Sequence, residues 1–91
     1  MTSVEAARLV VKSKTCHMVR RRKGPSVQYD ARPYHLGGKK KGWFYLDLFS
    51  ASAVTAVYDA LNEENRQRFA GLPLVTAVKV AFQLIQRNRE A

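Results

Sequence analysis

The sequence predicts an α+β fold, in which a small antiparallel three-stranded sheet in the N-terminal half packs against a C-terminal segment of three helices. Four of the five glycines and two of the three prolines lie in the first 45 residues, between short runs of β-branched and aromatic residues. From residue 50 onward, apolar residues recur at helical spacing. A chain of 91 residues supports one compact core. We therefore expect a single domain over 1–91, with 1–49 basic and mainly β and 50–91 helical.

The first half combines one ambiguous segment with three expected strands. Thr2 followed by Glu5 is typical of a capping box and predicts a helix from Ser3, although Leu9–Val11 suits a strand equally well. We expect a helix that runs into a strand. Strands are expected over 13–19, 26–34 and 43–48. In a meander of such strands, the loops at 20–25 and 37–42 would lie at opposite ends of the sheet, roughly 25–30 Å apart.

The first two expected helices are short and carry recognisable caps. Ser50 suits the N-cap of the first helix, with Phe49 and Val54 placed as a hydrophobic staple. Asn62 suits the N-cap of the second helix, which should end by Gly71.

The last expected helix has an unusually wide apolar face. Pro73 suits its first turn, and the helical pattern continues to about Arg89. Ala77, Val80 and Leu84 extend the apolar surface beyond the main stripe. Two alternatives remain open for these three residues: burial within one chain, or contact with a second copy in a homodimer.

Positive charge is concentrated in the first half of the chain. The net charge is +9, and the first 45 residues hold 11 basic and 2 acidic residues, against 5 of each in the remainder. Such a field favours polyanionic partners. The chain has no apolar stretch long enough to span a membrane and no secretory signal pattern, and its single cysteine cannot form an internal disulfide. We expect a cytoplasmic protein without a membrane partner.

The two basic loops are the candidate functional residues. Consecutive cations beside glycines suit phosphate contacts, and aromatic residues nearby, among them Tyr29, Tyr34 and Tyr45, suit stacking on unpaired bases if a sheet face exposes them. The alternative is that the cations are solvated loop tips and the aromatics belong to the core. The residues expected to bind nucleic acid, DNA or RNA, are Arg20, Arg21, Arg22, Lys23, Arg32, Lys39, Lys40, Lys41 and Trp43.

Catalytic and metal chemistry is not favoured. The run 37–42 is rich in glycine and lysine but lacks the Gly-Lys-Ser/Thr ending of a phosphate-binding loop. Cys16, His17 and His35 offer three soft ligands without a fourth, and adjacent strand residues point to opposite faces. We expect no enzyme activity, no catalytic residue, no metal and no cofactor.

The C-terminal half resembles small uncharacterised proteins encoded by actinobacterial phages. The resemblance rests on Ser-Ala-Ser-Ala-Val at 50–54, on 58–65 and on Leu-Pro-Leu at 72–74. It implies a protein active in the cytoplasm of a bacterial host. The segregated charge leads to the first hypothesis, a nucleic-acid-binding accessory or regulatory protein. The resemblance raises the alternative, a protein-interaction module that binds and modulates a host protein.

Overall fold

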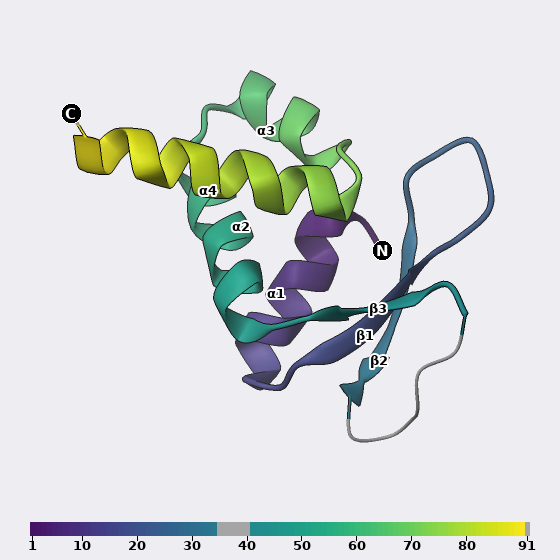
Figure 1. Ribbon diagram of the computed structural model, residues 1–91. Helices are drawn as coiled ribbons and strands as arrows, with labels where there is room; N and C mark the ends of the chain where they lie inside the picture. The colour runs from purple at the N-terminus through teal and green to yellow at the C-terminus, as the bar shows by residue number, and fades with distance from the viewer. Residues whose placement is uncertain (35–40, 91) are drawn as a thin grey trace.

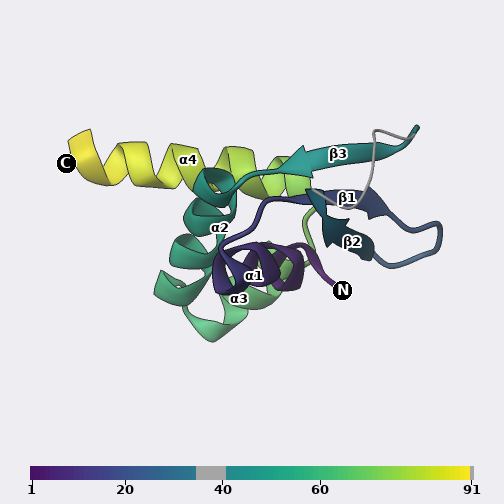
Figure 2. The same cartoon turned by 90° about the horizontal axis from the view of Figure 1, so that it is seen from below.

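The computed structural model describes residues 1–34 and 41–90 and has the predicted α+β fold, with a three-stranded antiparallel sheet followed by helices (Figure 1). The hairpin loop between the first two strands projects away from the helices in both views (Figure 2). The elements, in chain order, are α1 Ser3–Ser13, β1 His17–Arg21, β2 Tyr29–Pro33, β3 Trp43–Leu46, α2 Leu48–Ala60, α3 Glu63–Ala70 and α4 Leu74–Glu90.

Helix α1 begins with the expected capping box. The Thr2 side chain accepts a hydrogen bond from the Glu5 N–H, and the Glu5 carboxylate accepts one from the Thr2 N–H at 2.9 Å. The bond from the Thr2 N–H, followed by an interaction with the Thr2 side chain, stabilises the charged carboxylate and lowers the pKa of Glu5. The helix continues through Leu9–Val11 until Lys14 adopts a left-handed conformation at φ 53°. The expected transition into a strand is therefore wrong, and β1 starts only at His17.

The order of the strands in the sheet is β2-β1-β3, so the expected meander is wrong. The central strand β1 pairs antiparallel with both neighbours, which makes β2 and β3 parallel to each other. As a result, β3 begins at the same end of the sheet as the β1–β2 hairpin (Figure 2). The expected separation from the first basic segment is wrong for Lys41 and Gly42 for the same reason, and the rest of the second basic segment lies outside the described residues.

The inner face of the sheet supplies part of the core. Cross-strand partners share a face, and Val19 pairs with Ala31 on one side and Phe44 on the other. Val19 is fully buried among residues of α1, α2 and α4, and Ala31 and Phe44 pack against the same cluster. The helices meet through small side chains, because Ala6 and Ala7 of α1 and Ala51 of α2 are completely buried.

Tyr29 ties the sheet to the last helix and to the N-terminus. Its ring is 3% exposed, and its hydroxyl accepts a hydrogen bond of 2.7 Å from the Leu74 N–H at the start of α4. Its backbone exchanges hydrogen bonds with Met1 at the outer edge of β2. An N–H at a helix start has no partner within its helix. The Tyr29 hydroxyl therefore satisfies a buried group that would otherwise be unpaired.

Helix α2 begins three residues earlier than Ser50 predicts. Asp47 is the N-cap, and its carboxylate accepts a hydrogen bond from the Ser50 N–H at 3.4 Å. Phe49 lies inside the first turn and stacks on Phe82 of α4, with ring centroids 5.4 Å apart, so it forms no staple with Val54. The expected cap was wrong because an Asp and a Ser three residues apart both have the chemistry of an N-cap.

The last two helices agree closely with the sequence. The Asn62 side chain accepts a hydrogen bond from the Asn65 N–H at 2.9 Å, and Gly71 caps the end of α3. In α4, Ala77 is fully buried within the single chain and is therefore excluded from contact with a second copy. Val80 and Leu84 are half-buried against the core.

Candidate nucleic-acid interface

The run of cations at 20–23 is divided by the geometry of β1. Arg20 and Arg21 belong to the strand itself rather than to a loop, so their side chains leave opposite faces of the sheet. Arg20 lies on the outer face, where its guanidinium contacts the Asp30 carboxylate at 3.1 Å. The Arg22 guanidinium approaches the same carboxylate at 3.7 Å. Arg20 and Arg22 thus lie together on the outer face, and Arg21 projects from the opposite one.

Lys41 and Gly42, the described part of the second basic segment, lie at the same end of the sheet. Gly42 has φ +89°, and a Cβ atom built there would lie 3.9 Å from two side-chain carbons of Arg20. The positive φ suits glycine and turns the chain into β3. Lys41 is exposed directly before this turn. Lys39 and Lys40 lie outside the described residues, so Lys41 is the member of that run that the structure places beside the hairpin.

A shallow depression lies at this end of the sheet. It has a volume of about 430 Å³ and is lined by Arg20, Arg22, Lys23 and Asp30. Asp30 is the only acidic residue between Glu5 and Asp47 in the sequence. One carboxylate therefore faces several cations, and the depression keeps an excess of positive charge suited to phosphate.

Trp43 lies on the outer face between two arginines that come from the other strands. Arg20 of β1 and Arg32 of β2 place their guanidinium carbons 4.8 and 4.6 Å from the Trp43 ring centroid. Arg32 is separated from β3 by the central strand, so its side chain extends across β1. Met18 lies on this face and pairs across the strands with Arg32 and Tyr45. It is 2% exposed, but it does not belong to the core cluster on the helix side of the sheet.

A pair of tyrosines continues the outer face toward the other end of the sheet. The rings of Tyr34 and Tyr45 pack edge to face with centroids 5.1 Å apart, and each residue is 51% exposed. A hydrogen bond with the Cys16 side chain raises the pKa of the Tyr45 hydroxyl, which keeps the phenol neutral. Tyr29, in contrast, faces the helices, so it is not available for stacking.

Tyr34 and Tyr45 are not among the residues expected from the sequence to bind nucleic acid, although both suit stacking if a sheet face exposes them. Trp43 and Tyr45 are two residues apart on one strand, and that spacing places both side chains on the same face. The exposure of this face depends on which side the helices cover, and strand spacing alone does not reveal that.

The residues considered for metal binding do not form a cluster in the described parts of the chain. Across 1–34 and 41–90, no group of three His, Cys, Asp or Glu side chains is arranged to hold a metal ion. His17 is buried, and its Nδ1 lies 2.6 Å from the Thr15 carbonyl oxygen. Because a carbonyl oxygen only accepts, that nitrogen carries the hydrogen. His35 lies outside the described residues.

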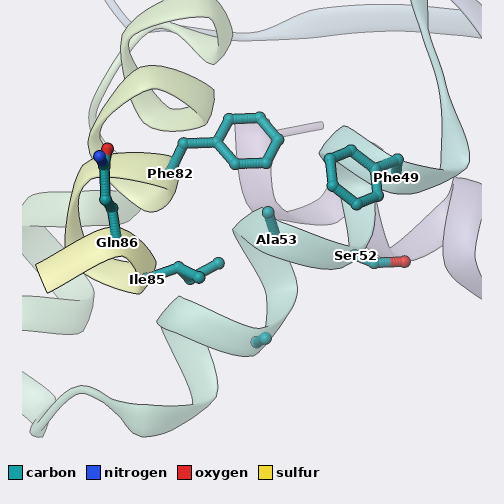
Figure 3. A pocket seen from close by; sticks show the side chains of 7 residues that line it. Phe49, Ser52, Ala53, Phe82, Ile85 and Gln86 are labelled. Atoms are coloured by element: carbon teal, nitrogen blue, oxygen red, sulfur yellow. The ribbon is translucent and has the colours of Figure 1, made fainter. Parts of the chain in front are cut away.

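A second surface feature is an apolar groove between α2 and α4 (Figure 3). It consists of two adjoining depressions of about 510 and 420 Å³ that share Ala56 and Ile85. Small residues of α2 form one wall, and Phe82 and Ile85 of α4 form the other. Phe49, at one end, is 73% exposed. Arg87 is the one charged residue among those that line the groove.

Comparison with known proteins adds no relative. No protein-family model, no curated protein and no solved structure matches the chain. Within the part of the chain that the structure describes, no helix is long and apolar enough to cross a membrane.

Proposed function

We propose that this protein is a non-catalytic nucleic-acid-binding accessory or regulatory protein that contacts phosphates at the hairpin end of its sheet. The observation that carries the proposal is the position of Lys41 near the basic hairpin. Trp43 pairs with Arg20, and Lys41 comes two residues before Trp43, at the end of the sheet that carries Arg22 and Lys23. A local concentration of cations can neutralise several phosphates at once, whereas loops at opposite ends of a sheet would act separately.

A salt series with a matched pair of lysine variants tests the proposal. Binding to labelled DNA and RNA should weaken steeply as salt rises, because each neutralised phosphate releases counterions. Lys41→Gln should weaken binding and reduce the slope of log K against log salt by about 0.7–0.9. Lys79→Gln removes an equally exposed lysine from α4 and should change neither quantity. Equal effects of the two variants would contradict a localised site.

A second candidate function is protein binding through the groove between α2 and α4. The observation in its favour is the exposure of Phe49 at one end of an otherwise apolar groove. The occupant that fits is an amphipathic helix of a host protein, with an acidic residue placed to meet Arg87. Phe49→Glu should abolish capture of such a partner without affecting nucleic-acid binding. Loss of nucleic-acid binding instead would count against this candidate.

A further inference from the structure

The outer face of the sheet combines cations with aromatic rings in one layer. Trp43 lies within 5 Å of two guanidinium groups, and the exposed Tyr34–Tyr45 pair lies beyond it along the face. Phosphate contact alone requires only the cations. Exposed rings beside them are the arrangement in which bases stack on aromatic side chains and arginine planes.

The spacing of the rings determines which form of nucleic acid can use them. Trp43 and Tyr45 are two residues apart on β3, so their side chains leave the sheet about 7 Å from each other. A stacked strand advances about 3.4 Å per nucleotide. Bases can therefore stack both on the tyrosine pair and on the arginines that cover Trp43 only if the strand opens its own stacking. A duplex keeps its bases stacked and paired inside.

We infer that the outer face of the sheet binds single-stranded nucleic acid, with bases stacked on the exposed Tyr34–Tyr45 pair and on the arginine planes that cover Trp43, and with phosphates held by Arg20, Arg22 and Lys41. This inference rests on the proposed function and specifies its ligand. The sugar is left open, because stacking and phosphate contact are common to DNA and RNA. The neutral Tyr45 phenol adds no negative charge beside the phosphates.

The anchoring of the rings supports this inference. Tyr45 is held by the edge-to-face contact of its ring with Tyr34. Trp43 is held by arginines from both other strands. Rings fixed before binding lose little conformational freedom when a base stacks on them, which favours affinity.

Fluorescence of Trp43, the only tryptophan of the chain, provides a direct test. The titrants are oligodeoxyuridylate, oligouridylate and a duplex, each of about twelve nucleotides, within the range of known single-strand sites. Both single strands should quench Trp43 and bind at least about five-fold more tightly than the duplex, as expected for one stacked base. A preference between the two single strands would show whether the 2′-hydroxyl is recognised.

Two results overturn the inference in different ways. Equal affinity for single strands and duplex, with Trp43 fluorescence unchanged, would overturn base stacking and leave the phosphate site standing. A lack of salt-sensitive binding to any of the three titrants would overturn the proposed function as well.

A variant series separates stacking from loss of structure. Tyr45→Ala should weaken single-strand binding about 5- to 150-fold, the range for one stacked base, and leave duplex binding unchanged. Tyr45→Phe keeps the ring and should retain most of the affinity. Phe49→Ala, which removes a more exposed ring on the helical side, should have no effect. A Tyr45→Ala variant that folds normally and binds single strands like the wild type would overturn the inference.

Discussion

The two faces of the sheet are built from alternate residues of the same three strands, yet they differ in every physical respect. The inner face carries Val19, Ala31 and Phe44, which pack against the helices. The outer face carries arginines and exposed aromatic rings over a single buried methionine. The difference teaches that strand parity separates the residues that build the core from those of the proposed binding surface, so substitutions on one face should leave the property of the other largely intact.

The largest expected effect compares one tyrosine from each face. Tyr29→Ala removes a buried ring and should lower the free energy of unfolding by about 3–5 kcal/mol, a large part of the stability of a domain this size. Tyr45→Ala removes a half-exposed ring and should lower it by about 0.5 kcal/mol or less. Urea denaturation followed by circular dichroism measures both. Similar losses for the two variants would contradict the separation of the faces.

Removal of a single oxygen atom tests the link between the sheet and α4. Tyr29→Phe keeps the ring but leaves the buried Leu74 N–H without its partner. We expect a loss of about 1–3 kcal/mol in unfolding free energy, the range for an unsatisfied buried donor. Tyr58→Phe is the matched control, because Tyr58 is half-buried on α2. An unchanged stability for Tyr29→Phe would show that this hydrogen bond does not hold α4 to the sheet.

The start of α2 offers a prediction with a defined pH dependence. Hydrogen bonds from Ser50, chiefly from its hydroxyl, lower the pKa of Asp47 below its ordinary value of 3.8. A lowered pKa in the folded state stabilises the protein above the unfolded pKa, and this contribution is lost as pH falls through the folded value. Asp47→Ala should cost about 0.5–2 kcal/mol at neutral pH.

The difference in unfolding free energy between the wild type and Asp47→Ala should become smaller in acid. Denaturation at neutral pH and well below pH 3.8 measures this difference. Glu5 titrates in both proteins and therefore cancels. Ser50→Ala tests the cap expected from the sequence and should cost less than Asp47→Ala at neutral pH. The reverse order of costs would place the N-cap at Ser50.

The variant with the smallest expected effect on stability should have a clear effect on the affinity for nucleic acid. Asp30→Asn removes the carboxylate that Arg20 and Arg22 share on the outer face. Exposed ion pairs contribute about 0–1 kcal/mol, so stability should change little. Affinity for nucleic acid should increase, because the released cations meet phosphate without competition. Asp59→Asn breaks an exposed pair with Arg8 on the helical side and should leave affinity unchanged. A lower affinity for Asp30→Asn would contradict the site.

The sequence predicts the fold class because most of its signals are local. The Thr2–Glu5 capping box, the Asn62 cap and the helical pattern after Pro73 depend only on neighbours within one or two turns. The order of the strands is not local. Sequential strands are neighbours in most sheets, but here the connection between β2 and β3 allows β3 to pair with the free side of β1. No residue in that connection indicates which edge the strand joins.

The candidate site is predictable in part for the same reason. The cations and Trp43 stand out by composition, so the sequence identifies them. Their convergence depends on strand order, and the roles of Tyr29 and Tyr45 depend on which face the helices cover. The convergence and the roles of the two tyrosines are both consequences of tertiary packing. Because Tyr29 and Tyr45 are the same residue type, the sequence does not distinguish the buried ring from the exposed one.

Methyl NMR spectra of Met18 and Val19 during titration with a single-stranded oligonucleotide test the separation of the two faces most directly. These adjacent residues of β1 face opposite sides of the sheet, Met18 beneath the outer layer and Val19 in the core. Bases stacked on the outer face should shift the Met18 methyl signal and leave the Val19 methyl signals nearly unchanged. Shifts of the Val19 methyls with Met18 unmoved would contradict binding at the outer face.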